Sequence, residues 1–528
     1  MGGLIIMEDS RTAFFFDEEE LKRRLAGVLT FRKITYIGCM DWKEKMKWKI
    51  LIILAALAGI LIVWCAGKAG ENSSTAESEI LKEYVLKENE WASAAEAVSS
   101  LKDRLVELAE NKVEEAAENV RTAVQEAETA GQEEKAAKED EQELPIKVLI
   151  MDNGFHSYYH DGIAIEFQGT CQGSGGETYQ QGETLEFTED SSLLGEGSYT
   201  LSPGEEKACM KVTSLTRGQG APVYRGSLTI YKDENGLRLV NTLPLEEYLY
   251  GVVPSEMPAS YPEEALKAQA VCARTYACVQ MMNSSLGDLG AQVDDSVSYQ
   301  VYQNSGEAQA SSQAVEDTAG EILLNNGSPI NAYYFSTSHG QTSTDQVWAA
   351  SAPSAYLQSV ECTYDSQEPW YQWEVDLSLE KILENVRGMF SGVTWVSGVE
   401  MAEGGTQEGV LKLVIHTDQG DQELHSEYDI RTALAPDGLS ITRQDGSQVM
   451  GSSLLPSAYF TLEEIRNAQG TLTGYKVQGG GYGHGVGMSQ NGAKGMADTG
   501  KNYQEILTYF YKDVEIGNIN DVVNPEES

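Results

Sequence analysis

The chain has 528 residues, enough for two or more folded domains, and its 81 acidic and 38 basic residues give a formal net charge of −43 at pH 7. This acidity excludes a general nucleic-acid-binding protein, because such a protein needs a basic surface for phosphate groups. The seven cysteines show no spacing typical of a disulfide framework, although a bridge between Cys171 and Cys209 is conceivable.

A membrane-spanning segment is the first element that the sequence predicts. Residues 50–67 form an apolar run without charge, close to the length of about 20 residues that one bilayer crossing needs. Four lysines between residues 43 and 49 precede this run, so we expect a single-pass protein of the cell membrane whose C-terminal bulk is extracytoplasmic. A cleaved signal peptide is the alternative. Residues 1–49 are then a cytoplasmic tail, or they result from a start codon assigned too far upstream.

A helical stalk is expected next. Residues 73–143 are rich in Ala, Glu and Lys, and apolar residues such as Leu101, Leu105 and Leu108 recur at helical spacing. The pattern predicts a helix or coiled coil that ends in a charged linker. It would act as a spacer above the membrane, or as a coiled coil that binds a partner.

The pattern changes at Pro145, where a mixed domain is expected to begin. Short strand-like runs at 146–150, 163–167 and 227–231 are separated by Gly-rich turns. Helical patterns follow at 263–281, 305–317, 379–390 and 503–511, with further strands between them, including 411–416. The predicted fold class is α+β, with β-rich modules and a helical hairpin, preceded by the membrane helix and the stalk. We place this domain at 145–516 and a C-terminal tail at 517–528.

Glu256 stands in the segment 251–258, which we expect to form a short turn between two helices. Residues 243–250 have a helical pattern, and Ser260 and Glu263 have the spacing of a capping box at the start of the next helix. A carboxyl group fixed at a helix junction suits acid–base chemistry. The alternative is that Glu256 only caps a helix.

A glycine-rich segment near the C-terminus is a second candidate site. Glycines at 479, 480, 481, 483, 485 and 487 would expose backbone amides to a ligand at close range. Tyr482, His484, Ser489 and Gln490 would offer polar groups to sugar hydroxyls or acetamides, although His484 also suits a structural hydrogen bond or a second catalytic role. The alternative is a tight strand and turn that needs positive φ at several positions. A phosphate-binding loop is excluded, because the segment lacks both glycine signatures of such loops.

Both segments resemble signature blocks of one family. The run 224–277 contains Leu-Pro-Leu-Glu-Glu-Tyr-Leu-Tyr-Gly-Val-Val-Pro-Ser-Glu-Met-Pro, and the run 479–493 contains Gly-Tyr-Gly-His-Gly-Val-Gly-Met-Ser-Gln-Asn-Gly-Ala. In this order they resemble the stage II sporulation protein D family, which includes amidase enhancers, and the resemblance covers roughly residues 146–516. It implies a lytic transglycosylase that acts on peptidoglycan, with Glu256 of the Pro-Ser-Glu-Met-Pro motif as its catalyst.

A third block, at 334–342, resembles the same family less closely. Many members have His-Ser-Thr-Ser-Gly-Gly there, whereas this chain has Phe335 and His339 at two of those positions. The resemblance implies that Ser336, Ser338, His339 and Gln341 line the glycan groove. Some relatives bind zinc in this region through paired Cys and His, but this chain has no such cluster. We therefore expect neither a metal ion nor another cofactor.

Lys267 and Arg274 lie on one face of the helix expected at 263–281. Near Glu256, this basic pair would bind the lactyl carboxylate of a glycan. The alternatives are surface charges or structural ion pairs.

A single carboxyl group is sufficient for a lytic transglycosylase, whereas an ordinary glycosidase needs two. The acid protonates the glycosidic oxygen, and the resulting carboxylate then takes the proton of the C6 hydroxyl, which attacks its own anomeric carbon. Because that nucleophile is tethered, proximity replaces a second catalytic group. Glu256 would need a raised pKa to be protonated at neutral pH.

The sequence and the resemblance together predict a membrane-anchored lytic transglycosylase. The implied substrate is a glycan strand without stem peptides, so an amidase partner and membrane sporulation proteins are expected in septal wall remodelling during engulfment. The alternative is a non-catalytic amidase enhancer, or a peptidoglycan-binding scaffold that works through the stalk.

Overall fold

The computed structural model describes residues 4–7, 13–16, 144–195, 197–348, 352–405 and 408–523. The chain divides into two compact units, Met1–Gln142 and Glu143–Ser528. In the first unit, β1 (Leu4–Met7) and β2 (Ala13–Phe16) form an antiparallel hairpin. The predicted membrane segment at 50–67 and the predicted stalk at 73–143 lie outside the described residues. Within those residues, no helix combines the length and the apolar character that a bilayer crossing requires.

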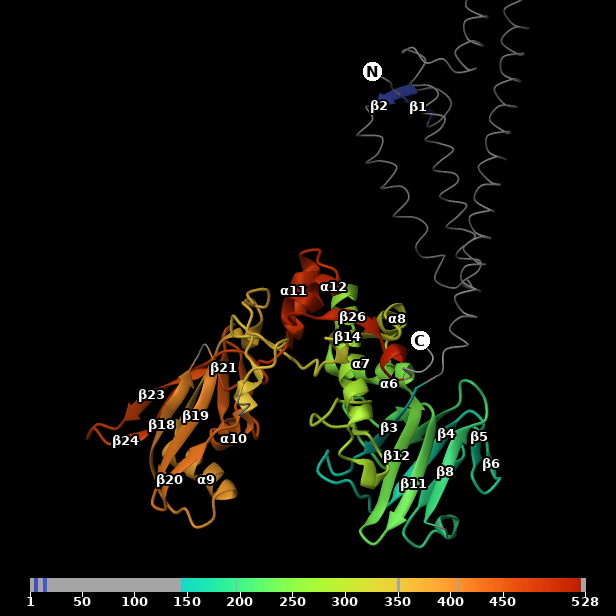
Figure 1. The fold of residues 1–528 in the computed structure, drawn as a ribbon, viewed down its shortest axis with the longest axis horizontal. Helices are drawn as coiled ribbons and strands as arrows, with labels where there is room; N and C mark the ends of the chain where they lie inside the picture. Colours follow the sequence, from blue (N-terminus) through green and yellow to red (C-terminus); the bar gives the residue numbers. More distant parts are fainter. Residues whose placement is uncertain are drawn as a thin grey trace, which may run out of the picture. The chain divides into compact units, whose positions relative to one another are not determined.

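The second unit begins with two β-sheets that share one hydrophobic core (Figure 1). The seven-stranded sheet has the order β13-β3-β12-β11-β8-β5-β6, and the four-stranded sheet has the order β10-β9-β4-β7. Alternate residues of β4 are buried, as expected for a strand with one face on a core. The strands are β3 (Pro145–Ile150), β4 (Ile163–Gln168), β5 (Cys171–Gly173), β6 (Thr178–Tyr179), β7 (Thr184–Phe187), β8 (Ser198–Pro203), β9 (Cys209–Val212), β10 (Val223–Tyr224), β11 (Ser227–Asp233), β12 (Gly236–Pro244) and β13 (Val293–Asp294).

A group of helices follows β12 and surrounds one central helix. This helix, α7 (Glu263–Met282), contacts α6 (Leu245–Glu256), α8 (Gln309–Asp317), α11 (Gln490–Asp498) and α12 (Tyr503–Phe510). Its small buried residues, among them Ala268, Ala270, Ala273 and Ala277, let these neighbours approach closely. Strand β14 (Glu321–Asn325) also contacts α7 and pairs with β15 (Ser328–Pro329) and β26 (Glu515–Asn518), and α13 (Asn520–Val523) comes last.

Residues 373–479 form a lobe with a separate hydrophobic core. One sheet has the order β22-β21-β17-β24-β23, and a second has the order β18-β19-β20. Side chains of both sheets meet those of two helices in this core. The elements are β17 (Trp373–Ser378), α9 (Leu379–Met389), β18 (Val396–Gly405), β19 (Gly409–Thr417), β20 (Gly420–Leu424), α10 (Glu427–Ala433), β21 (Ser440–Arg443), β22 (Gln448–Met450), β23 (Phe460–Arg466) and β24 (Leu472–Gly479).

The structure confirms the mixed α and β character of the unit, including the hairpin of α6 and α7. Two local predictions at that hairpin are wrong. Helix α6 continues to Glu256, so 251–256 is helical rather than a turn. Helix α7 begins after Pro262, and no side chain caps its first turn, so Ser260 and Glu263 form no capping box.

Candidate functional site

Glu256 is the last residue of α6, and Met257 leaves the helix in an extended conformation. The helix ends there because Met257 precedes Pro258, and a residue before proline is disfavoured in the α region. The residue is partly accessible to solvent, while its neighbours Val253 and Met257 are buried. A carboxyl group in this position is reachable by a ligand and is also largely shielded from water.

Three effects set the pKa of Glu256, and burial is the largest. Burial raises the pKa, whereas hydrogen bonds from the Val301 backbone N–H and the Tyr334 hydroxyl lower it, and the result is a pKa of about 7. The Val301 nitrogen lies 2.7 Å from Oε1. At neutral pH the carboxyl group therefore exists in both protonation states, which suits a group that first donates a proton and then accepts one.

A buried amide orients the Tyr334 hydroxyl toward Glu256. The Nε2 of Gln300 donates to the Tyr334 oxygen over 3.2 Å, and the Oε1 of Gln300 accepts from the Tyr248 hydroxyl over 3.3 Å. Because the Tyr334 oxygen already accepts this bond, its own proton is directed to the carboxyl group of Glu256. Burial raises the pKa of Tyr334 well above its usual value, so the hydroxyl stays a donor.

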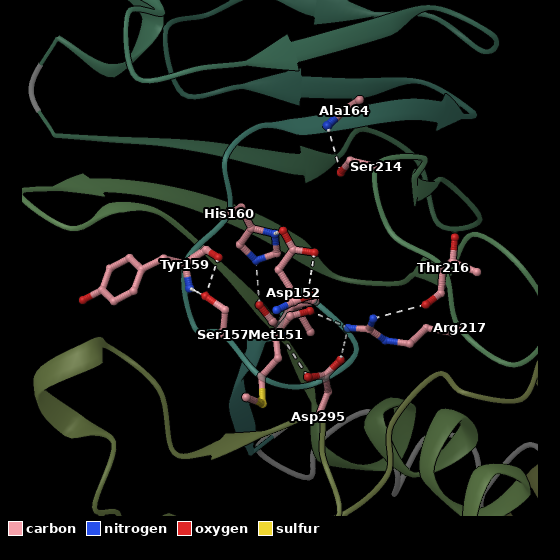
Figure 2. A network of polar contacts seen from close by, with 12 residues as sticks. Met151, Asp152, Ser157, Tyr159, His160, Ala164, Ser214, Thr216, Arg217 and Asp295 are labelled. Carbon is pink, nitrogen blue, oxygen red and sulfur yellow. Dashed lines mark hydrogen bonds and ion pairs between the residues drawn. The ribbon is translucent and has the colours of Figure 1, made fainter. Parts of the chain in front are cut away.

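The segment that carries Gln300 and Val301 is fixed at its start by a buried ion pair (Figure 2). Arg217 Nη2 lies 2.7 Å from Asp295 Oδ2 and donates to the Met151 carbonyl over 2.6 Å, while the Met151 N–H donates to Asp295 Oδ1. These bonds tie the segment to the end of β3. Burial raises the pKa of Asp295 to about 6 against the opposing charge of Arg217.

Gly251 allows the same segment to approach α6. A Cβ at Gly251 would lie 2.7 Å from the ring of Tyr302 and 2.7 Å from Nε2 of Gln303, closer than real side chains approach. The glycine therefore permits the contact that brings Val301 to the carboxyl group.

The three blocks singled out in the sequence come together around Glu256. Strand β16 (Tyr334–Phe335) pairs in parallel with β25 (Met488–Ser489), in the register Tyr334 to Met488. Just after β25, the Nε2 of Gln490 donates to the backbone carbonyl of Glu256 over 3.0 Å. Gln490 thus holds the end of α6 and is a predicted binding residue in direct contact with the catalytic candidate.

The glycine-rich segment is a tightly packed backbone. Gly481, Gly483, Gly485 and Gly487 all have positive φ, between +79° and +110°. A Cβ at Gly485 would lie 2.1 Å from the Tyr459 hydroxyl oxygen, so only glycine fits there. The requirement for positive φ, which was the alternative to a binding role for these glycines, is thus present in the structure.

His484 uses both ring nitrogens on backbone groups. Its Nδ1 accepts from the Val486 N–H over 3.1 Å, and the ring also bonds to the backbone of Tyr334. Burial, with a contribution from the charge of Arg431, lowers the pKa of His484 to about 4, so the ring is neutral at physiological pH. In this arrangement His484 holds the strand of Tyr334 in place.

The predicted basic pair is engaged in ion pairs. Arg274 is fully buried, and its Nε and Nη2 each lie 2.7 Å from a carboxylate oxygen of Glu246. Lys267 Nζ lies 2.6 Å from Glu263 and 3.0 Å from Asp317. Both cations are thus neutralised within the protein, and their binding of a glycan carboxylate stays a prediction.

The predicted serines are mostly occupied by internal hydrogen bonds. The hydroxyls of Ser338 and Ser489 both donate to buried Asp365, over 2.8 and 2.7 Å. Ser336 is partly exposed, and its hydroxyl lies 3.3 Å from that of Thr337. A binding role for these hydroxyls is not tested by this geometry.

The remaining predicted residues lie toward the separate lobe. The ring of His339 stacks on Tyr459 with a centroid distance of 4.1 Å, and Gln341 forms an isolated bridge with Glu361. Tyr482 is 40% exposed and lies against Trp370, at a centroid distance of 4.7 Å. His339 and Tyr482 therefore belong to a surface next to the lobe.

A cluster of partly exposed aromatic rings near Glu256 was not identified from the sequence. Tyr333, which precedes the hydrogen-bond donor Tyr334, belongs to this cluster, and burial raises the pKa of Tyr276, with the charge of Glu256 among the lesser causes. The ring of Tyr276 lies 6.0 Å from Tyr333, which in turn lies 4.7 Å from Trp348. Aromatic faces beside a catalytic acid suit the apolar faces of sugar rings.

The described residues hold no cluster of three or more His, Cys, Asp or Glu side chains arranged for a metal ion. The five cysteines in this part of the chain, including Cys171 and Cys209, are free thiols. All of the site's polar contacts given above are between protein groups.

The fold and the site define a mixed α and β protein in which a shielded carboxyl group with a raised pKa, that of Glu256, lies at the end of a helix. Comparisons with known proteins assign its family. A family model described as stage II sporulation protein matches residues 233–324, and a domain of unknown function (DUF8618) matches 349–487. The chain belongs to the stage II sporulation protein D family.

Three relatives illustrate this assignment. Stage II sporulation protein D of Bacillus subtilis (strain 168) is 32% identical over 338 residues, which cover 60% of this chain and 87% of the relative. The protein of the same name from Bacillus amyloliquefaciens is 32% identical over 305 residues, covering 55% and 78%. An amidase enhancer of Bacillus subtilis (strain 168) is 30% identical over 295 residues, covering 50% of this chain and 39% of the enhancer.

Proposed function

We propose that the chain is a lytic transglycosylase that cleaves peptidoglycan glycan strands lacking stem peptides, with Glu256 as the acid and base. The observation that carries this proposal is the pKa of about 7 at a partly accessible carboxyl group, which Val301 and Tyr334 hold in place. A group with this pKa is protonated in a large fraction of molecules at neutral pH and can also serve as a base.

The reaction needs two proton transfers by the same group. Protonated Glu256 donates its proton to the glycosidic oxygen, and the bond between that oxygen and the anomeric carbon breaks. The Glu256 carboxylate then accepts the proton of the C6 hydroxyl of the muramic acid as its oxygen bonds to the anomeric carbon. The products are a 1,6-anhydro sugar and a strand with a free hydroxyl, and no water is consumed. Effective molarities of about 10⁵ M or more are reached by well-oriented tethered nucleophiles.

The surroundings of Glu256 support this cycle. The Val301 N–H and the Tyr334 hydroxyl stabilise the carboxylate formed after the first transfer, while burial favours return to the protonated form. The partly exposed rings of Tyr276, Tyr333 and Trp348 offer stacking surfaces for the sugar units beside the scissile bond. We further propose that residues 50–67 anchor the enzyme in the membrane and that an amidase supplies the peptide-free strands.

The test is to incubate the chain of residues 1–528 with amidase-treated glycan strands and to analyse the products by mass spectrometry. We expect 1,6-anhydro ends from the wild type and a rate at least about 10²-fold lower for Glu256→Gln. Glu505→Gln is a matched control, because this exposed glutamate lies on α12, pairs with Lys501 and should leave the rate unchanged. Reducing ends in place of anhydro ends would show hydrolysis and would require a second carboxylate.

An amidase enhancer without its own activity is the second candidate, and the similarity to a protein of that name favours it. In that case the chain would leave purified strands intact, and it would raise the rate at which an added amidase releases stem peptides. The Glu256→Gln variant would then enhance the amidase as well as the wild type does.

A further inference from the structure

A cavity of about 490 Å³ lies at the five-stranded sheet of the separate lobe. Its volume falls in the range of small-molecule sites. The cavity is lined by His339, Tyr371, Gln372, Trp373, Glu374, Thr442, Arg443, Gln444, Tyr459, Gln478, Gly479 and Gly480. Most of these residues come from the lobe, and none of them makes a described contact with Glu256. The cavity is therefore distinct from the surroundings of Glu256 described above.

Aromatic rings form fixed walls of this cavity. Trp373 is buried, and its Nε1 donates to the Gly481 carbonyl over 3.0 Å, which sets the orientation of the indole. Tyr459 is buried in its stack with His339, and Tyr371 is partly exposed. The two buried rings expose little surface, so partly exposed Tyr371 is the aromatic side chain that a ligand in the cavity can reach.

Amide side chains line the cavity beside the rings. Gln372, Gln444 and Gln478 are all exposed, and each amide carries both donors and acceptors. The Nε2 of Gln478 has only a long contact, of 3.5 Å, to Glu374. Alternating apolar and amide surfaces match a ligand with apolar ring faces and with hydroxyl and acetamide groups at its edges, which is the chemistry of an amino sugar.

Among the lining residues, Arg443 carries a positive charge, while the carboxylate of Glu374 is bonded to Lys476 over 2.9 Å. Its guanidinium group lies over the ring of Trp370 at 5.3 Å, and its Nε donates to Ser447 over 2.8 Å. Among the residues that the structure describes, the two terminal nitrogens of Arg443 have no hydrogen-bond or ion-pair partner. An arginine with two free donors fits a carboxylate in bidentate geometry.

We propose that this cavity is a second carbohydrate-binding site, which binds carboxylate-bearing amino-sugar units of the strand that Glu256 cleaves. The identity of the ligand rests on the proposed function, because that function supplies the strand. Tyr334, which bonds to Glu256, and His339, which lines the cavity, are five residues apart, so their Cα atoms are at most about 18 Å apart. A strand of a few sugar units spans that distance, so the cavity would hold the strand while its neighbouring units occupy the site of Glu256.

The test measures binding of peptide-free glycan strands to chain 1–528 that carries Glu256→Gln, which prevents turnover during the measurement. Adding Arg443→Gln should weaken binding about tenfold or more, the effect of losing one charge-assisted hydrogen bond. Arg466→Gln is the matched control, because this arginine lies on β23 of the same sheet, pairs with Glu464 and does not line the cavity. Gln478→Ala should also weaken binding, and it tests the cavity without changing its charge.

A second ligand tests the chemistry of recognition. Strands whose lactyl carboxylates have been reduced to alcohols should bind the wild-type cavity more weakly, and Arg443→Gln should no longer matter for them. Equal binding by Arg443→Gln and Arg466→Gln would overturn the proposal, as would binding that requires stem peptides. The two proposals fail separately. If binding depends on Arg443 but the wild type cleaves no strands, the proposed transglycosylase activity is wrong and the proposed binding site stands. If the wild type cleaves strands but binding does not depend on Arg443, the proposed activity stands and the proposed binding site is wrong.

Discussion

Replacing Glu256 by glutamine should change how the stability of residues 143–528 depends on pH. In the folded chain Glu256 keeps its proton up to a pKa of about 7, whereas in the unfolded chain it loses the proton near the ordinary value of 4.5. Between these values the folded state binds more protons than the unfolded state, so the free energy of unfolding falls as the pH rises. Below the unfolded pKa, Glu256 is protonated in both the folded and the unfolded chain, so it causes no loss of unfolding free energy there.

The size of the effect follows from the width of this window. Two pH units of it lie between pH 5 and pH 7, and at about 1.36 kcal/mol per unit the wild type loses at most about 2.7 kcal/mol there. Partial exposure of Glu256 makes this an upper bound. A glutamine side chain has no such proton to lose. The free energy of unfolding of Glu256→Gln should therefore rise by up to this amount, relative to that of the wild type, between pH 5 and pH 8. For 386 residues with an unfolding entropy of about 0.8 kcal/mol/K, the relative gain in Tm is about 3 °C.

Calorimetry of wild type and variant at pH 5, 6, 7 and 8 measures this difference directly. Glu505→Gln is a control that should show no such trend, because the hydrogen bond from Lys501 lowers the pKa of this exposed carboxyl group below the ordinary value of 4.5. Its stabilising effect is nearly complete above the unfolded pKa, so the Tm difference between the wild type and Glu505→Gln should stay nearly constant from pH 5 to pH 8. A Tm difference between wild type and Glu256→Gln that stays constant from pH 5 to pH 8 would refute the raised pKa of Glu256.

Three other substitutions test the arrangement. Tyr334→Phe removes a donor to ionised Glu256, so the alkaline limb of kcat/KM against pH should move up by about one unit, and an unmoved limb would contradict this hydrogen bond. Arg274→Lys breaks a buried bidentate ion pair and should cost about 3 kcal/mol in urea unfolding, and a loss below about 1 kcal/mol would count against that pair. Gly485→Ala places a Cβ 2.1 Å from a tyrosine hydroxyl and should lower the free energy of unfolding by more than about 2 kcal/mol. Gly446→Ala has the same φ of +79° but open space around it, so it should lower the free energy of unfolding by less in the same assay.

The sequence predicted the elements of the hairpin better than their ends. The pattern at 263–281 agrees with α7, because a 20-residue helix gives a long periodic signal. The end of α6 was misplaced, since Gly251 and Pro254 read as turn residues in the sequence. In the structure Gly251 instead serves a close contact with Tyr302, a tertiary reason that no local pattern contains.

The partners of Glu256 were partly beyond prediction for a similar reason. Tyr334 lay in a recognised block, but its hydrogen bond to Glu256 joins residues 78 positions apart and depends on tertiary packing. Val301 acts through its backbone N–H, which every residue except proline has, and Gln300 lies in no motif. The direction of Arg274 toward Glu246 likewise follows from how α6 packs on α7.

The long-range contact between Gln490 and Glu256 has a consequence for when the site exists. The two residues are 234 positions apart, and the chain is made from its N-terminus, so Glu256 emerges long before the residue that fixes its backbone. The strand that pairs with β16 also comes from this late segment. A nascent or C-terminally truncated chain therefore carries the acid without its completed surroundings. Synthesis itself delays the assembly of the surroundings of Glu256 until almost the whole chain is available to fold.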